Sequence, residues 1–272
     1  MSWLKEVIGT EKAIIAMCHM QAMPGDPGYD AEKGMDWVVE KAYNDLIGLQ
    51  NGGVDAVMFS NEFSLPYLTN VDTSTVAAMA AVIGELKRYI KIPFGVNVLW
   101  DGEKTIDLAQ ACGADFVREI YSGVYASDFG LWNTNYGRVA RHKQSIDADR
   151  VKLIFNILPE AAKYLSDRDI VETARTTVFN CKPDAICVSG LTAGAETDSQ
   201  VLAKVKNAVP DMVVLANTGC RPDTIEAQLG IADGAVVGTT FKVDGKFENA
   251  VDENRVKAFM EVVKNFRNKV SV

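Results

Sequence analysis

Eight short apolar runs recur along the 272-residue chain, and segments with the periodicity of amphipathic helices separate them. The runs are almost uniformly apolar, which is typical of parallel strands buried on both faces. Eight alternations without a linker favour a closed (β/α)8 TIM barrel, formed as a single domain over residues 1–272. A doubly wound open sheet is the alternative, but no G-x-G-x-x-G follows the first run. The expected strands are Ala13–Cys18, Ala56–Phe59, Phe94–Leu99, Phe116–Ile120, Val151–Ile157, Ala185–Val188, Val213–Ala216 and Ala235–Val237.

Helices are expected between these strands, and several end in a short hinge that contains glycine and aspartate. The hinges are Gly53-Val54-Asp55, Gly113-Ala114-Asp115 and the related Ile231-Ala232-Asp233. We expect each to close its helix with a left-handed cap, which glycine adopts readily. The expected helices are Met35–Gln50, Thr73–Ile90, Lys104–Cys112, Asp169–Asn180, Ser199–Ala208, Pro222–Gly230 and Asn254–Lys269.

Composition narrows the class of protein and its partners. A hydrophobic share of 48% provides ample core, and the net charge of −8 argues against nucleic acid or an anionic membrane as the main partner. The five cysteines are odd in number and form no Cys-x-x-Cys pair, so they indicate reduced thiols. With no apolar signal region and no apolar run of membrane-spanning length, we expect a cytoplasmic protein. The sequence is compatible with a homo-oligomer as well as with a monomer.

The segment Met212–Lys242 contains two strand-to-glycine turns in tandem. In a TIM barrel the loops after strands seven and eight often hold a phosphate, because glycine lets backbone N–H groups approach an anion closely. Glycine ends strands in many α/β proteins, but two such turns at this spacing favour a phosphate site. We expect the phosphate to bind at Gly219, Gly238 and Thr239.

Polar residues end most of the apolar runs, where side chains point into or just above the mouth of a barrel. Charged groups are rare in such interiors unless they are paired or functional. These positions are His19, Asn61 with Glu62, Asn97, Arg118 with Glu119, Asn156, Ser189, Asn217 and Thr239. We interpret Asn97, Asn156, Ser189 and Asn217 as substrate-binding residues. The other histidine, His142, lies in a polar run that resembles a solvated helix face.

His19, Glu62 and Arg118 are the candidate catalytic residues. Arg118 interrupts an apolar strand, so we expect it to pair with Glu62, with Glu119 or with a substrate anion. Arg118 and Glu119 alternate faces, so only one should point into the barrel. Next to Arg118, the pKa of Glu62 should be lowered, which would keep Glu62 ionised as a base while His19 shuttles a proton near neutral pH.

Two connections that leave the carboxyl ends of strands are unusually long: residues 21–34 and residues 121–135. Each is expected to be either a lid over the site or a surface loop. The second is rich in aromatic side chains that suit stacking on a ligand or packing on a neighbouring subunit. The aromatic residues of this connection are Tyr121, Tyr125, Phe129 and Trp132, and Tyr136 follows directly after it.

Metal and nucleophilic chemistry have little support in the sequence. No His-x-His or His/Cys cluster is present, which argues against a structural zinc site. We expect no cofactor, although Mg²⁺ held by Asp or Glu and a substrate phosphate would leave little sequence signature. No G-x-S-x-G nucleophile turn is present either.

Six segments closely resemble the BtpA/SgcQ family, and its SgcQ branch in particular. They are AMCHMQAMPGDP (16–27), GGVDAVMFSNEFSLPY (52–67), IPFGVNVLWD (92–101), VREIYSGVYASDFG (117–130), DAICVSGLTAGAETD (184–198) and ADGAVVGTTFKVDGKFENAVDENRV (232–256). The resemblance covers essentially the whole chain and implies a single-domain barrel related to ribulose-phosphate-binding barrels. Some relatives are linked to photosystem I biogenesis, and the SgcQ branch to sugar uptake and processing.

The chain departs from the wider family at three strand ends. Many members carry Glu-Asn-x-x-Asp after strand two, an Asp and a Lys-His pair after strand five, and Gly-Ser-Gly after strand seven. Here the corresponding stretches are residues 60–64, residues 156–160 and Asn217-Thr218-Gly219. Each change alters acid–base capacity, so the chemistry of other members need not transfer.

These observations lead to three hypotheses about function. The favoured one is an isomerase, epimerase or lyase that acts on a small phosphorylated sugar or nucleoside-like compound. The second is a hydrolase of a glycosidic or phosphate bond, with Glu62 activating water. The third is a non-catalytic assembly or regulatory factor, as the relatives linked to photosystem I suggest.

Overall fold

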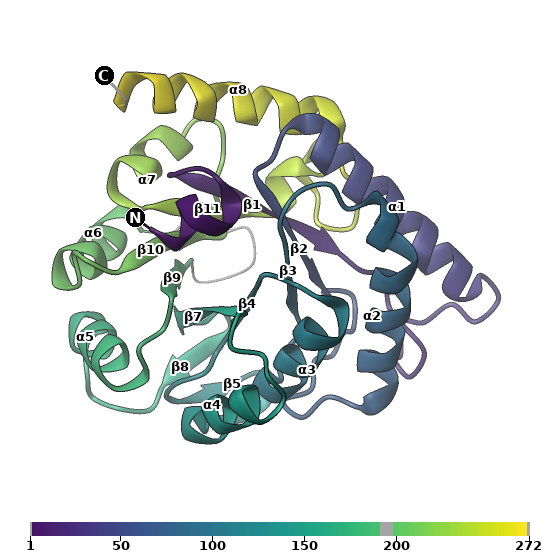
Figure 1. Cartoon of the computed structure of the whole chain (residues 1–272), viewed down its shortest axis with the longest axis horizontal. Coiled ribbons are helices and arrows are strands. Elements are labelled where there is room, and N and C mark those ends of the chain that lie inside the picture. Colours follow the sequence, from purple (N-terminus) through teal and green to yellow (C-terminus); the bar gives the residue numbers. More distant parts are fainter. Residues whose placement is uncertain (1, 191–197, 271–272) are drawn as a thin grey trace.

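The computed structural model describes residues 2–190 and 198–270, in which eight parallel strands close into a barrel (Figure 1). The order around the barrel is β1-β11-β10-β9-β7-β4-β3-β2. This confirms the predicted TIM barrel. Of the segments that carry the resemblance, 184–198 lies partly outside the described residues. The barrel strands are β1 (Ala13–His19), β2 (Ala56–Ser60), β3 (Phe94–Asn97), β4 (Phe116–Glu119), β7 (Lys152–Leu158), β9 (Ala185–Ser189), β10 (Val213–Asn217) and β11 (Gly234–Val237).

The α-helices surround this barrel as an outer layer (Figure 1). Three differ from expectation: α2 ends four residues early in a 3₁₀ turn, η2 (Lys87–Tyr89), α7 begins three residues after Pro222, and α4 is not among the expected helices. The helices are α1 (Gly34–Gly52), α2 (Thr73–Leu86), α3 (Gly102–Cys112), α4 (Tyr136–Ser145), α5 (Ile170–Cys181), α6 (Ser199–Ala208), α7 (Ile225–Ile231) and α8 (Glu253–Val270). Shorter helical turns are η1 (Leu4–Ile8), η3 (Thr239–Phe241) and η4 (Val243–Gly245).

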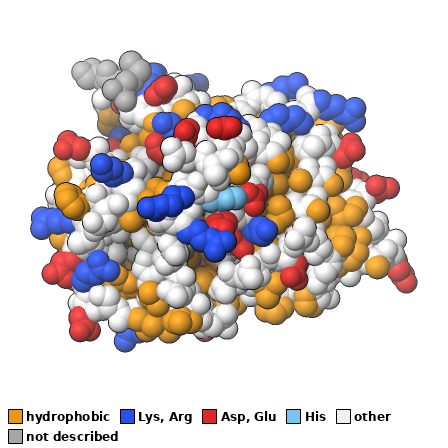
Figure 2. Space-filling view, turned by 60° about the horizontal axis from the view of Figure 1, so that its bottom comes forward, with side chains coloured by type: hydrophobic (Ala, Val, Ile, Leu, Met, Phe, Trp, Pro, Cys, Tyr) orange, Lys and Arg blue, Asp and Glu red, His pale blue; other side chains and the backbone are white. Residues whose placement is uncertain are grey.

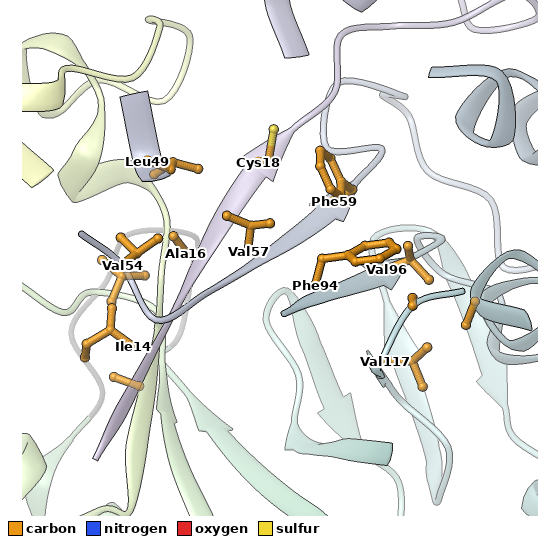
Figure 3. Close-up of a cluster of buried hydrophobic side chains, with 14 of the residues drawn as sticks. Ile14, Ala16, Cys18, Leu49, Val54, Val57, Phe59, Phe94, Val96 and Val117 are labelled. Carbon is orange, nitrogen blue, oxygen red and sulfur yellow. The ribbon is translucent and has the colours of Figure 1, made fainter. Parts of the chain in front are cut away.

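Alternate residues of each strand face two separate hydrophobic cores. On β1, Ile14, Ala16 and Cys18 pack outward against the helices (Figure 3), whereas Ile15 and Met17 pack inside the barrel. We call the inner set the apolar layer, and η1 contributes to it from the amino-terminal side. The apolar layer consists of Trp3, Leu4, Ile8, Ala13, Ile15, Met17, Ala56, Met58, Phe116, Ile154, Ala185, Cys187, Leu215 and Val236.

The aspartates of the predicted hinges tie neighbouring strands together. The Asp55 carboxylate accepts a hydrogen bond from Ile14 N–H at 2.7 Å, and Asp115 accepts one from Phe94 N–H at 3.0 Å. Gly53 and Gly113 form the expected left-handed caps. The third hinge is different, because the cap residue Ala232 is extended, with φ −81°.

The long connection after β4 is not an irregular loop. It forms a hairpin of β5 (Val124–Ser127) and β6 (Gly130–Asn133), and β5 pairs antiparallel with β8 (Ala162–Tyr164), which follows β7. Tyr125 and Trp132 are buried inside this small sheet rather than presented to a second subunit. That the segment acts as a lid stays a prediction.

Charged side chains of both signs are interspersed with hydrophobic ones over the face shown in Figure 2. The negative net charge is therefore not gathered into one acidic patch on that face. Across the described part of the chain, none of the helices combines the length and the apolar character that a membrane crossing requires.

Candidate active site

A pocket of about 490 Å³ lies where the carboxyl ends of the barrel strands meet. His19, Glu62 and Arg118 all line it, although they come from three different strands or the loops after them. The glycine turns after β10 and β11 line the same pocket through Gly219, Gly238 and Thr239. The structure therefore brings the predicted catalytic set and the predicted phosphate turns to one cavity.

The floor of this pocket is a ring of mostly polar residues that follows from strand alternation. On each barrel strand, the residue two positions after the last one in the apolar interior also points inward, because side chains alternate along a strand. We call this set the polar layer: His19, Ser60, Asn97, Arg118, Asn156, Ser189, Asn217 and Gly238. Within the polar layer, a chain of hydrogen bonds runs from β3 to β7 across the barrel.

Arg118 is the centre of that network. Its Nη1 donates to Asn217 Oδ1 at 2.7 Å, and its Nη2 donates to Asn97 Oδ1 at 3.0 Å. Its side chain is 6% exposed, yet none of the ion pairs among residues 2–190 and 198–270 includes it. The expected contact with Glu62 or Glu119 is therefore wrong: two amide oxygens hold the guanidinium, and the neighbouring carboxylates interact with its charge only at longer range.

Asn97, Asn156 and Ser189 lie beneath the pocket rather than in its described wall. Asn217 Nδ2 donates to Ser189 Oγ at 2.6 Å, and Ser189 Oγ donates to Asn156 Oδ1 at 3.3 Å. That these three residues bind substrate stays a prediction, since they lie outside the described pocket wall. They position Arg118 and Asn217, and only Asn217 of the four predicted binding residues lines the pocket.

Glu119 occupies the opposite face of β4 from Arg118, as alternation predicted. It is 1% exposed and accepts hydrogen bonds from Ile120 N–H at 2.6 Å and from Asn97 Nδ2 at 2.8 Å. Burial raises the pKa of Glu119 to about 8, although the hydrogen bond from Ile120 and the charge of Arg118 oppose the shift. Glu119 thus helps to fix Asn97 and takes no part in the pocket wall.

Glu62 is held by two hydroxyl groups. Tyr67 Oη donates to Glu62 Oε2 at 3.1 Å, and Ser60 Oγ donates to Oε1 at 3.3 Å. Burial raises the pKa of Glu62, and the opposing charge of Arg118 is the smaller effect. The expectation of a lowered pKa is wrong because desolvation outweighs the attraction of an arginine that makes no direct contact.

His19 lies next to Glu62, with its Nε2 4.0 Å from Glu62 Oε1. Burial lowers its pKa well below the usual value, and the nearby charges of Lys242 and Arg118 add to that effect. The imidazole is therefore neutral near neutral pH, which corrects the expectation that it titrates there. Its Nδ1 is buried and has no hydrogen-bond partner among the described residues. A Cβ at Gly238 would lie 3.1 Å from His19 Nε2, so this glycine leaves room for the ring.

Lys242 and Asp45 form a buried ion pair behind the pocket that sequence reasoning missed. Lys242 Nζ lies 3.0 Å from Asp45 Oδ2, and Lys242 is only 1% exposed. Asp45 also accepts a hydrogen bond from Val251 N–H at 2.8 Å. The pair joins α1 to the segment after β11, which carries Phe247 to within 5.3 Å of the His19 ring centroid.

Glu160 is a second carboxylate in the pocket wall that sequence reasoning missed. Burial, and after it the negative charge of Glu62, raise its pKa to about 7 against the opposing charge of Arg118. The signal available in the sequence was its place two residues after the carboxyl end of β7. Glu62, Glu160 and Arg118 thus share the cavity.

The two glycine turns leave hydrogen-bond donors available. Among the bonds of the described residues, none uses the backbone N–H of Gly219, Gly238 or Thr239. Arg221 and Arg255 line the pocket beside these turns, and Arg255 Nε donates to Thr240 O at 3.0 Å. Backbone N–H groups and arginines together are the donors that protein phosphate sites use.

Within residues 2–190 and 198–270, no three His, Cys, Asp or Glu side chains cluster in a way that suits a metal ion.

These features define a TIM barrel with ionisable side chains in a pocket at its carboxyl face. The chain belongs to the BtpA family, whose model matches residues 10–265. It is 64% identical to the sgc region protein SgcQ of Escherichia coli K12, over 98% of this chain and all of that protein. It is 27% identical to the photosystem I biogenesis protein BtpA of Synechocystis, over 96% of this chain and 91% of that protein.

The fold is shared with phosphoribosyl anthranilate isomerase from Thermus thermophilus. The TM-score is 0.57, the identity is 8%, and the match covers 94% of this chain and all of that one. Such a likeness shows the TIM-barrel fold alone.

Proposed function

We propose that this protein is an enzyme that binds a small phosphorylated sugar derivative and moves protons at one of its carbon atoms, as an isomerase, epimerase or lyase does. One observation carries the proposal. The unused N–H groups of Gly219, Gly238 and Thr239 line the same pocket as His19, Glu62 and Arg118. An anion held on the turns would place the rest of the molecule over these ionisable side chains.

The proposed roles follow from the surroundings of each group. Glu62 is held in place by Tyr67 and Ser60 and acts as the base that removes a proton from carbon. The oxyanion that forms is stabilised by the guanidinium of Arg118. His19 is neutral, so it offers one N–H donor and one acceptor nitrogen and can pass a proton between neighbouring oxygens.

The phosphate site is tested by NMR of the ¹⁵N-labelled protein with ribose 5-phosphate and with ribose. We expect saturable shifts of the Gly219, Gly238 and Thr239 amide signals with the phosphate ester and none with ribose, because the turns recognise the anion. Gly238→Val is a poor test, since the new side chain would also displace His19. Shifts confined to other parts of the molecule would remove the basis of the proposal.

The hydrolase remains a second candidate, because Glu62 and Glu160 are two carboxylates with raised pKa values in one pocket. Glycoside hydrolysis uses such a pair, one as acid and one as base or nucleophile. Exchange of solvent deuterium into a substrate carbon separates the candidates, because proton abstraction predicts it and hydrolysis does not.

The photosystem-linked relative suggests a third candidate, a non-catalytic assembly factor. Such a factor has no need of a buried histidine, glutamate and arginine gathered in one pocket, which is why we favour an enzyme.

A further inference from the structure

The pocket has two chemically different walls that face each other across the barrel. One wall, which we call the anion-binding wall, consists of Gly219, Gly238 and Thr239 in the glycine turns after β10 and β11. Tyr67, Trp100 and Phe129, which we call the aromatic wall, follow β2, β3 and β4. In the strand order β1-β11-β10-β9-β7-β4-β3-β2, the pair β3 and β4 lies four positions from the pair β11 and β10. In an eight-stranded ring that is the opposite side.

The aromatic wall is held by contacts between rings. The Tyr67 ring lies edge-on to Trp100 and to Phe129, with centroids 5.8 Å and 5.2 Å apart. Behind them, Trp132 packs on Trp100 at 5.2 Å and is itself 4% exposed. A ligand that enters the pocket therefore meets ring surfaces already in place, and planar rings gain from stacking on such surfaces.

The proposed base lies next to the aromatic wall. Tyr67 donates its hydroxyl proton to Glu62, so one residue belongs to the wall and also fixes the base. His19 and Arg118 line the same cavity between the two walls. The position where protons move is thus flanked by an anion site on one side and ring surfaces on the other.

From this arrangement we infer that the substrate is a phosphorylated sugar that carries a planar ring on its anomeric carbon, rather than a plain sugar phosphate. The inference rests on the proposed function and names its substrate class. Phosphate binds the glycine turns, the ring stacks on Trp100 and Phe129, and the sugar carbons lie over Glu62 and His19. A plain sugar phosphate would leave the aromatic wall uncovered.

The test compares matched ligands by isothermal titration calorimetry. The pairs are ribose 5-phosphate with uridine 5′-monophosphate, and glucose 6-phosphate with 4-nitrophenyl β-glucoside 6-phosphate. In at least one pair we expect the ring-bearing compound to bind about tenfold more tightly or better, the gain that stacking of one ring supplies. Equal affinity within both pairs would overturn the inference.

Phe129→Ala shows whether the gain comes from the aromatic wall. Phe129 lies at the tip of the hairpin, so its truncation removes a stacking surface with little effect on the barrel. We expect this variant to lose most of the advantage of the ring-bearing compound and to bind the plain sugar phosphate unchanged. The matched control is Leu131→Ala in the same hairpin, at a side chain that is 57% exposed and outside the described pocket wall.

The two proposals fail in different ways. If Phe129→Ala weakens both members of a pair equally, or neither, the substrate class is wrong although the phosphate site stands. If none of the four compounds binds the wild-type protein, the proposed function fails and takes the inference with it.

Discussion

The apolar layer and the polar layer are adjacent layers of side chains inside one barrel. The same strands build both, yet one layer is apolar and the other is mostly polar. The apolar layer holds side chains such as Ile15, Met17 and Phe116, which stabilise the fold by leaving water. Two residues further along, the same strands bury His19 and Arg118. Burying the arginine costs free energy, and no carboxylate of the described residues contacts it to offset that cost.

The comparison indicates that the apolar layer stabilises the fold and that the polar layer serves ligand binding. An interior that served only the fold would continue the apolar layer to the end of each strand. Instead, the network from Asn97 to Asn156 supports two pocket-lining side chains, Arg118 and Asn217, either directly or through Ser189. Substitutions in the two layers should therefore separate stability from ligand binding.

Phe116→Ala, in the apolar layer, should have the largest effect on stability. Its ring fills the space over Gly95, where an added Cβ would lie 2.3 Å from it, and it packs on Trp3 at 6.2 Å between centroids. We expect a loss of about 3–5 kcal/mol in the free energy of unfolding, measured with urea, because a cavity replaces a buried ring. Ribose 5-phosphate affinity of the folded fraction should stay unchanged.

The matched control is Phe179→Ala, at a phenylalanine that is 80% exposed. It should change the free energy of unfolding by no more than about 0.5 kcal/mol. A loss of affinity in Phe116→Ala that exceeds its loss of folded protein would contradict the separation of the layers.

Arg118→Met, in the polar layer, should act mainly on binding of an oxyanion. Against a phosphorylated hydroxamate, which mimics an enediolate, we expect a loss of about 10–150-fold, the value of one charge-assisted hydrogen bond. Ribose 5-phosphate itself should lose much less affinity, because the glycine turns hold its phosphate. Calorimetry with both ligands measures the split.

The control for that variant is Arg168→Met. Arg168 lies over the ring of Tyr164 in β8 and outside the described pocket wall. It should leave both affinities unchanged. An equal loss for the two ligands in Arg118→Met would instead make Arg118 a general support of the pocket.

Glu160→Gln should produce the smallest effect, one that depends on pH. The pKa of Glu160 is about 7 in the folded protein, above its ordinary value of 4.5, so the folded state keeps this proton to higher pH than the unfolded chain. Its contribution to stability is present below pH 4.5 and is lost as the pH rises through 7. The glutamine variant should therefore gain stability relative to wild type over that range.

Urea unfolding at a series of pH values measures this gain. A constant difference between variant and wild type across the series would show that burial in the pocket does not perturb the Glu160 carboxyl.

Much of this architecture could be predicted because local sequence carried the signal. Uniformly apolar runs such as Val213–Ala216 identified parallel strands, and alternation placed Arg118 and Glu119 on opposite faces. Polar residues at strand ends located the pocket. These inferences need only the periodicity of a strand and the geometry of a barrel.

What could not be predicted depends on contacts between distant segments. The pairing of β5 with β8 joins residues almost forty positions apart in the chain, and Lys242 contacts Asp45, which lies 197 positions earlier. The pKa of Glu62 was misjudged for a related reason. The sign of its shift depends on how far burial outweighs Arg118, and spacing in a sequence does not report burial.

The small antiparallel sheet has a consequence for how this barrel can diversify. TIM barrels usually change specificity one loop at a time, because each loop is anchored only to its own strand and helix. Here β5 and β8 are hydrogen-bonded partners, through Tyr125 with Tyr164 and Ser127 with Ala162. The loops after β4 and β7 are thereby coupled, and a graft that exchanges one without the other would leave an unpaired strand edge. Successful chimaeras between relatives should carry both loops from the same parent.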